Sequence, residues 1–333
     1  MISVLLPYRN AHGTIEEAAS SVLADMSPDD ELVLVDDGST DDGPAIVEEL
    51  ALASKGRRVV RMASGGVGIA GALMCGLERC RGELVARMDA DDVSLPGRLA
   101  AERALLEADP TLGAVATLVE PFGENVAEGV RRYVGWQNSL VSAEDHARSI
   151  FVEAPVCHPS TMLRRAALDA VGGFRGGDFA EDYDLWLRLV EAGWGIAKVP
   201  HVLFRWRIHG RNATWTDPRL SFEALRRLRA RHLAKRIDRP FGIWGAGAYG
   251  RRLARELEAN GARVSFFIDI DPLKIGRTRR GAPVLTVDDG LARARNESAL
   301  VIVAIAVFGA RDIVRAQLTD RGFVEGADFV CAG

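Results

Sequence analysis

The first 92 residues alternate between short apolar runs and longer segments whose apolar residues recur at helical spacing. The apolar runs that predict strands are 2–6, 31–35, 58–62 and 84–88. The segments that predict helices are 14–26, 43–54 and 69–80. Because strands that alternate with helices pair in parallel, the pattern predicts an α/β fold with helices on both faces of the sheet.

The pattern from residue 112 to residue 210 is less regular. Short strands are predicted at 113–119, 161–163 and 196–199, and a helix at 181–193. Residues 217–236 predict another helix, with leucines on one side and arginines around the rest. This helix has two interpretations: a solvated face on a packed linker, or attachment to an anionic membrane.

At residue 237 the pattern of strand, turn and helix begins again. A strand at 241–244 runs into a glycine-rich turn, a helix follows at 249–260, and a second strand at 263–268 ends at Asp269. We therefore predict two domains: residues 1–236, which include the basic linker helix 217–236, and a smaller α/β domain of residues 237–333.

Composition excludes several classes of protein. The chain has 333 residues, of which 48% are apolar and 26% charged, and its net charge is −4. These values are ordinary for a globular protein and disfavour a disordered chain, a fibre or a basic nucleic-acid coat. The four cysteines have no zinc-site spacing. No signal peptide or membrane span is visible, so we expect a cytoplasmic protein, with peripheral contact at the inner face of the membrane as an alternative.

Two acidic clusters directly follow predicted strands. Asp89-Ala90-Asp91-Asp92 comes after the run at 84–88, and Asp36-Asp37 comes after the run at 31–35. Ligands of parallel α/β sheets bind at the carboxyl ends of strands. Two carboxylates one residue apart can hold Mg²⁺ or Mn²⁺ beside phosphate oxygens. The alternative for each cluster is an Asp-rich turn, solvated or capping the next helix.

Two later segments carry further candidate chemistry. Glu181-Asp182 opens a predicted helix, where acidic residues are stabilised by the helix dipole or can serve as a general base. Arg205-Trp206-Arg207-Ile208-His209 follows an apolar stretch, and a neutral His209 could bind the same metal ion as the acidic cluster.

The order of these segments is more specific than any one of them. The chain resembles family 2 inverting glycosyltransferases of the GT-A fold over residues 1–215. The segments that carry the resemblance are VLLPYRN, LVLVDDGSTDD, GVGIAGALMCGLERCRGELVARMDADD, HPSTMLRRAAL, GGFR, AEDYDLWLRL and FRWRIHG.

The resemblance implies a role for each matching residue. Asp182 would be the catalytic base, and Asp91 would hold the metal ion with His209 completing its shell. Asp36 and Asp37 would contact the base and the ribose, with Asp36 at the base, and Asp89 would contact the ribose or support the site. The residues expected to bind the nucleotide sugar are Pro7, Tyr8, Arg9, Asp36, Asp37, Gly68, Ile69, Asp89, His158, Arg205 and Arg207.

The implied activity is transfer of a sugar from a nucleoside-diphosphate sugar to a hydroxyl of a glycan or lipid-linked acceptor, with Mn²⁺ or Mg²⁺, in cell-surface polysaccharide biosynthesis. No nucleic-acid partner is expected. Two alternatives stay open: a nucleotide-sensing protein with a degenerate transferase domain, and an NAD-dependent sugar-nucleotide oxidoreductase. The donor sugar, the acceptor and the oligomeric state are not specified by the sequence.

The glycine-rich turn of the smaller domain supports two interpretations. Gly245, Gly247 and Gly250 follow a strand and open a helix, and Asp269 ends the next strand, as in a site for NAD or another nucleotide. The same turn could serve packing in a Rossmann-like module. The segment FIDIDPLKIGRTRRGAPVL resembles nucleotide-binding-like modules found beside sugar-modifying enzymes.

Overall fold

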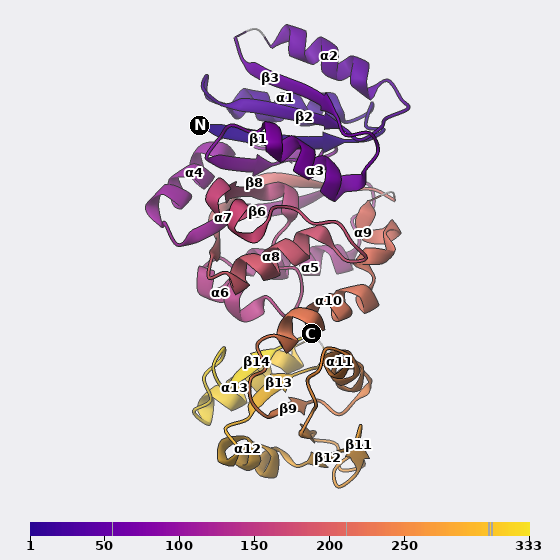
Figure 1. Ribbon diagram of the computed structural model, residues 1–333, viewed down its shortest axis with the longest axis vertical. Helices are drawn as coiled ribbons and strands as arrows, with labels where there is room; N and C mark the ends of the chain where they lie inside the picture. Colours follow the sequence, from indigo (N-terminus) through magenta and orange to yellow (C-terminus); the bar gives the residue numbers. More distant parts are fainter. Residues whose placement is uncertain (55, 211, 306, 308) are drawn as a thin grey trace. The chain divides into compact units, whose positions relative to one another are not determined.

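A computed structural model of the chain describes residues 1–54, 56–210, 212–305, 307 and 309–333. The chain divides into two compact units, each with its own sheet (Figure 1). The first unit consists of Met1–His146 and Pro155–Asp217, and the second of Ala147–Ala154 and Pro218–Gly333. The domain boundary at 236/237 stays a prediction, since packing alone groups the helix that precedes it with the second unit.

The first unit carries most of the α/β alternation expected from the sequence. Its strands are β1 (Ile2–Tyr8), β2 (Glu31–Asp36), β3 (Arg58–Ala63), β4 (Leu84–Arg87), β5 (Val93–Ser94), β6 (Leu112–Gly123), β7 (Thr161–Arg164) and β8 (Gly195–Ile208). Its helices are α1 (Ile15–Asp25), α2 (Gly43–Ala53), α3 (Gly68–Arg79), α4 (Arg98–Ala108), α5 (Glu128–Ser139), α7 (Arg165–Val171), α8 (Glu181–Glu191) and the short α9 (Ala213–Thr216). Helix α6 spans Ala143–Ser149, and a 3-10 turn spans His158–Ser160.

The eight strands form one sheet in the order β3-β2-β1-β4-β7-β6-β8-β5. The first four are parallel, as predicted, but β7 runs antiparallel to β4 and β6, and β5 antiparallel to β8. Strand β8 is much longer than the predicted 196–199 and continues through the apolar, arginine-containing segment that ends at Ile208. The fold class is therefore confirmed as α/β, with a sheet that is mostly parallel.

Strands β1, β2 and β4 are buried on both faces. Val4 and Leu6 of β1 belong to the core cluster that includes α1, whereas Leu5 points to the opposite face. A Cβ on Gly76 of α3 would lie 2.3 Å from Leu5 Cδ1, so glycine allows this helix to lie directly on the strand. Figure 1 shows α3 in front of β1. This two-sided burial explains why the early strands are continuous apolar runs.

The second unit has a six-stranded sheet in the order β11-β12-β10-β9-β13-β14. Apart from β11, the paired strands are parallel. The strands are β9 (Phe241–Trp244), β10 (Phe266–Ile268), β11 (Thr278–Arg279), β12 (Ala282–Leu285), β13 (Leu300–Val303) and β14 (Phe329–Cys331). The helices are α10 (Phe222–Ala234), α11 (Ala248–Ala259), α12 (Val287–Asn296) and α13 (Ala310–Asp320), and a 3-10 turn covers Pro218–Leu220.

Helix α10 differs from the basic helix expected at 217–236. Two of its arginines are buried rather than solvated or available to a membrane. The Arg226 guanidinium lies 3.6 Å from the Glu256 carboxylate, and Arg229 donates a 2.6 Å hydrogen bond to the Tyr249 hydroxyl. A charge pattern cannot reveal this, because the partners lie on α11, 20 to 30 residues further along the chain.

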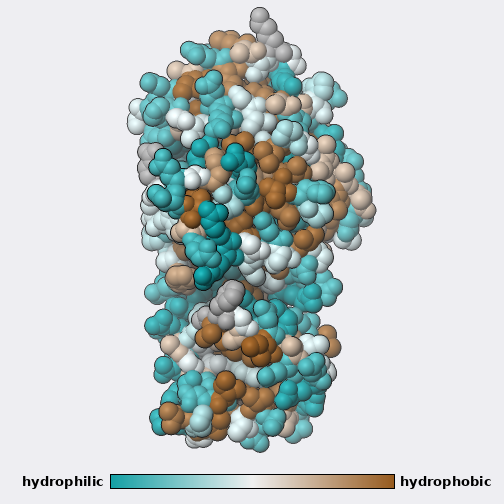
Figure 2. Space-filling model, turned by 180° about the vertical axis from the view of Figure 1, so that it is seen from behind, coloured by the Kyte–Doolittle hydropathy of each residue, from teal (hydrophilic) through white to brown (hydrophobic). Residues whose placement is uncertain are grey.

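The surface is mixed in character. Figure 2 shows separate apolar patches among hydrophilic residues on the back face. Within the described part of the chain, no helix combines the length and the apolar composition that crossing a bilayer requires.

Candidate functional site

Three aspartates gather where β4 ends. Carboxylate oxygens of Asp89, Asp91 and Asp92 all lie within 4.8 Å of one another. Burial and the neighbouring Asp89 charge raise the pKa of Asp91, and burial with both neighbours raises the pKa of Asp92 well above its usual range. The cluster concentrates negative charge that a divalent cation would stabilise.

The end of β8 reaches the same cluster. His209 Nε2 lies 2.9 Å from Asp91 Oδ2. The Arg207 backbone N–H donates to Asp92 Oδ1 at 2.8 Å, and Arg207 Nε donates to the Asp91 carbonyl at 2.6 Å. The structure therefore brings together three of the predicted residues, Asp91, Arg207 and His209. More than 110 positions separate Asp91 from the other two in the sequence.

Arg205 points to a different partner. Its Nε lies 3.2 Å from the Glu120 carboxylate on β6, and its guanidinium lies over the Phe122 ring at 4.2 Å. The Arg207 guanidinium lies over the same ring at 4.5 Å. Only Arg207, of the two predicted phosphate-binding arginines, contacts the acidic cluster in the described structure.

Arg87 is a site residue that the sequence reasoning missed. It is buried at the end of β4, and its Nη2 lies 2.7 Å from Asp89 Oδ1. Its positive charge also lowers the pKa of Asp182, so it acts on both predicted carboxylates. The available signal was a lone arginine inside the apolar run 84–88, directly before the acidic cluster.

Asp182 occupies the first turn of α8, as predicted. Its Oδ1 accepts a 2.6 Å hydrogen bond from the backbone N–H of Tyr183. Burial raises the pKa of Asp182 to about 7, with a further contribution from Glu181, despite the opposing effect of that hydrogen bond and of Arg87. A carboxyl group with this pKa is suited to take up a proton near neutral pH.

The predicted nucleotide residues surround the ends of β1 and β2. Asp37 is buried and bridges two segments: it accepts a 2.6 Å hydrogen bond from the Ser64 hydroxyl and a 3.0 Å hydrogen bond from the Gly68 N–H. Asp36 is half-buried, and its side chain accepts a hydrogen bond from the Ser39 N–H. Asp37 thus holds the glycine-rich loop in place, which leaves Asp36 as the better placed of the two carboxylates for a ligand.

The other predicted nucleotide contacts differ in accessibility. Tyr8, next to Pro7 at the end of β1, is buried, and its pKa rises to about 12 because of burial and Asp36. Arg9 is exposed, and Ile69 is half-buried at the start of α3. Their roles toward a nucleotide stay predictions.

His158 lies in an aromatic environment. Its ring centroid is 5.5 Å from that of Trp186 and 5.7 Å from that of Phe174. Burial lowers the pKa of His158 well below its usual range, so the ring is neutral. His158 is therefore buried among aromatic rings, and its predicted contact with a sugar stays a prediction.

The glycine-rich turn of the second unit is closed by its own aspartate. A Cβ on Gly250 would lie 1.8 Å from the Gly245 carbonyl oxygen, so this turn requires glycine for packing. Asp269 is buried and accepts 2.9 Å hydrogen bonds from the backbone N–H groups of Ala246 and Asp271, and it pairs with Lys274 at 3.3 Å. Because protein groups already occupy both carboxylate oxygens, the expectation of NAD at Gly245, Gly247, Gly250 and Asp269 gains no support.

Asn212 supports the turn that carries His209. Its Oδ1 accepts a 2.6 Å hydrogen bond from the His209 N–H, and its Nδ2 donates a 2.9 Å bond to the Arg207 carbonyl.

We expect Asn212→Ala to lower the thermal unfolding midpoint, because the loss of these buried bonds costs about 1–3 kcal/mol. Asn212→Asp keeps the acceptor and should give an intermediate midpoint. Scanning calorimetry measures both variants, and a midpoint equal to that of the wild type for Asn212→Ala would contradict this role.

Comparison with known proteins agrees with this arrangement. Residues 3–172 match the family model described as glycosyl transferase family 2. The chain is 29% identical over 213 residues to the amylovoran biosynthesis glycosyltransferase AmsE of Erwinia amylovora, covering 62% of this chain and 76% of that protein. It is 27% identical to the O-antigen biosynthesis glycosyltransferase WbnJ of Escherichia coli, covering 64% and 81% of the two chains.

Solved structures show the same fold. TarS of S. aureus in complex with UDP-GlcNAc superposes with a TM-score of 0.55 at 21% identity, over 77% of this chain and 71% of that one. The mannosyltransferase PcManGT of Pyrobaculum calidifontis, in complex with GDP-Man and Mn²⁺, gives a TM-score of 0.52 at 24% identity, over 70% of this chain and 61% of that one. The family match spans just over half of the 333 residues, so the chain belongs to glycosyl transferase family 2 and is a glycosyltransferase.

Proposed function

We propose that the protein is a metal-assisted inverting glycosyltransferase. It moves a sugar from a nucleoside-diphosphate sugar to a hydroxyl of a glycan or lipid-linked glycan in cell-surface polysaccharide biosynthesis. The observation that carries this proposal is the meeting of the Asp89–Asp92 cluster with His209, at the carboxyl ends of β4 and β8. The Asp89–Asp92 end of this site lies within residues 3–172, which match the family model.

The residues of this cluster fit a divalent cation. Asp92 is 1% exposed, and its Oδ2 has no hydrogen-bond partner among the described residues. Carboxylate oxygens with one imidazole nitrogen suit Mg²⁺ or Mn²⁺. Asp91 and His209 would hold the ion, with Asp89 and Asp92 beside them. The ion supplies positive charge that stabilises a departing diphosphate.

Asp182 performs the proton chemistry in this proposal. Its carboxylate accepts the proton of the acceptor hydroxyl while the hydroxyl oxygen attacks the anomeric carbon. The bond to the nucleoside diphosphate breaks on the opposite side of the ring, which inverts the anomeric configuration. Arg207 contributes a cation beside Asp91, where the negative charge of the leaving group develops.

The comparisons support the class of substrate. AmsE and WbnJ are named for the biosynthesis of amylovoran and of an O-antigen. TarS and PcManGT are seen with UDP-GlcNAc and with GDP-Man. These names support a nucleoside-diphosphate sugar as the donor and a surface glycan as the acceptor that we propose for this chain. A lipid-linked acceptor would bring the enzyme to the inner face of the membrane.

In this proposal the second unit takes no part in the transfer reaction. Residues 237–333 form an appended Rossmann-like domain that keeps the glycine turn for packing, as the contacts of Asp269 support. A nucleotide-sensing protein or an NAD-dependent oxidoreductase would need this turn open to a ligand.

Release of nucleoside diphosphate tests the proposed function. The purified protein is incubated with UDP- and GDP-sugars, with Mn²⁺, with Mg²⁺ or with EDTA. We expect at least one donor to be turned over with a metal ion and not with EDTA. Absence of turnover, together with nucleotide affinity that does not depend on metal, would contradict the proposal, and reduction of NAD by any sugar nucleotide would favour the oxidoreductase.

A further inference from the structure

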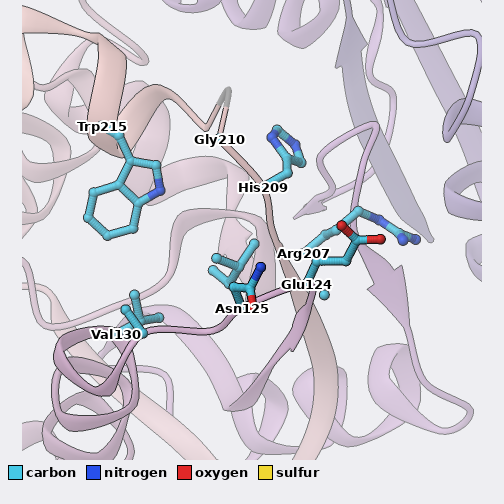
Figure 3. Close-up of a pocket in the computed structure, with 10 residues that line it drawn as sticks. Glu124, Asn125, Val130, Arg207, His209, Gly210 and Trp215 are labelled. Carbon is cyan, nitrogen blue, oxygen red and sulfur yellow. The ribbon is translucent and has the colours of Figure 1, made fainter.

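A pocket of about 560 Å³ opens beside the acidic cluster, within the first unit. Its walls come from the end of β6 and the turn that follows, from the first turn of α5, from the end of β8 and from α9. Arg207 and His209 form the wall shared with the acidic cluster. Figure 3 shows Trp215, Val130 and Asn125 around the hollow, with His209 nearby. The volume lies in the range of small-molecule sites, about 300–1,000 Å³.

The lining combines an aromatic face with hydrogen-bonding groups that have no protein partner. Trp215 is 53% exposed, although large apolar side chains are usually covered. Glu124 and Asn125 make no side-chain hydrogen bond or ion pair among the described residues, and neither does the indole N–H of Trp215. Asn125 is also held at a φ of 58°, a backbone conformation that costs energy and is common at ligand sites.

A sugar ring matches this chemistry. A pyranose has an apolar face of C–H groups that can lie on an indole ring, and an equator of hydroxyls that both donate and accept hydrogen bonds. Trp215 and Val130 supply the apolar contact, and Asn125 and Glu124 supply an amide and a carboxylate for the hydroxyls.

We propose that this pocket binds a sugar residue of the glycan acceptor, with Trp215 as its stacking platform; this inference rests on the proposed function. Strand order separates the pocket from the nucleotide residues. Asp36 and Asp37 follow β2, whereas the pocket lies at the ends of β6 and β8, in the other half of the sheet. A donor that reaches the acidic cluster from β2 and an acceptor in the pocket would meet at this cluster, where Arg87 pairs with Asp89 and also acts on Asp182, the proposed base.

Fluorine NMR of the full chain tests binding directly. The six tryptophans are replaced by 5-fluorotryptophan, and the Trp215 resonance is assigned from its loss in Trp215→Phe. Methyl β-glycosides of glucose, galactose, N-acetylglucosamine and mannose are titrated to 100 mM, with UDP and Mn²⁺ present. We expect a saturable shift of the Trp215 resonance with at least one glycoside. A shift with UDP alone and none with any glycoside would overturn the proposal and assign the pocket to the donor.

Kinetics provide the second arm, with the acceptor that gives turnover in a screen of the same glycosides. Trp215→Ala should raise the acceptor KM about tenfold and change the Kd for UDP less than twofold, and Trp215→Tyr should restore most of the affinity. Trp136→Ala, which removes a tryptophan of α5 outside the pocket, is the matched control. An unchanged acceptor KM in Trp215→Ala would overturn the proposal, as would an equal loss of UDP affinity.

The two arms separate failure of this inference from failure of the proposed function. If no donor is turned over but glycosides still shift the Trp215 resonance, the protein has a sugar site and is not the proposed transferase. If donors are turned over and neither arm responds, the transferase stands and the pocket is not its acceptor site.

Discussion

Asp91→Asn is expected to reduce kcat by roughly 10³-fold, the range seen when a group that stabilises transition-state charge is removed. The change keeps the size of the side chain and removes one negative charge from a cluster whose oxygens lie within 4.8 Å of one another. It also removes the carboxylate that contacts His209 at 2.9 Å. The substitution would therefore weaken Mn²⁺ binding in two ways, through the lost Asp91 carboxylate and through the lost contact that positions His209.

The measurement is nucleoside diphosphate release over a range of Mn²⁺ concentrations. We expect the half-saturating Mn²⁺ concentration to rise as kcat falls. Asp29→Asn is the matched control, because Asp29 is an exposed aspartate of the same unit with no ion pair among the described residues. Normal turnover by Asp91→Asn at the wild-type Mn²⁺ requirement would show that this carboxylate does not hold the ion.

Asp182→Asn should abolish transfer and leave the Kd for UDP within twofold of the wild type. Loss of a general base costs about 10²–10⁴-fold in rate, and the amide cannot accept the acceptor proton. Isothermal titration measures UDP binding, and a coupled assay measures transfer. Full transfer activity in Asp182→Asn would exclude this residue as the base.

The pH profile provides an independent check on Asp182. A base must be deprotonated, and the pKa of this group is raised to about 7, so kcat/KM should rise with pH up to about 7 and then level off. Glu181 contributes to the raised pKa, so Glu181→Gln should move the acid limb to lower pH. Two results together would assign the acid limb of the profile to a group other than Asp182. The limb would have to stay at the same pH in Glu181→Gln, and it would have to persist in the residual activity of Asp182→Asn.

The same pKa has a consequence for stability, with a definite sign. The folded protein holds the Asp182 proton more tightly than the unfolded chain, whose usual value is 3.8. The stability that this proton contributes is therefore complete at low pH and is lost as pH rises through about 7. At pH 8, Asp182→Asn should then unfold at a higher temperature than the wild type, which is the reverse of its effect on activity.

The early strands and the two acidic clusters could be predicted because each is a local pattern. Strands β1, β2 and β4 are mostly apolar, with aspartates at the end of β2 and two positions after the end of β4. The second half of β8 was not predicted as strand, although Phe204 and Ile208 are buried in the core and Arg205 pairs with Glu120. Its strand character comes from pairing with β6, which no local window contains.

The sequence also did not reveal which arginines are buried. Arg226 and Arg229 look solvated in the sequence, where arginine is abundant. Both are buried because residues of α11, 20 to 30 positions further along the chain, meet them, whereas Arg87 pairs with Asp89 only two residues away. The roles of these residues become visible only when the folded chain brings opposite charges together.

Under the two proposals above, Asn212 joins binding of a metal ion at His209 and binding of an acceptor sugar at Trp215 into one thermodynamic cycle. Asn212 fixes the backbone of Arg207 and His209 on one side and begins α9, which carries Trp215, on the other. If an ion at His209 stiffens this turn, it lowers the entropy that an acceptor sugar must lose at Trp215. Linkage then requires symmetry: whatever factor the metal ion adds to acceptor affinity, the acceptor adds to the affinity for the metal ion.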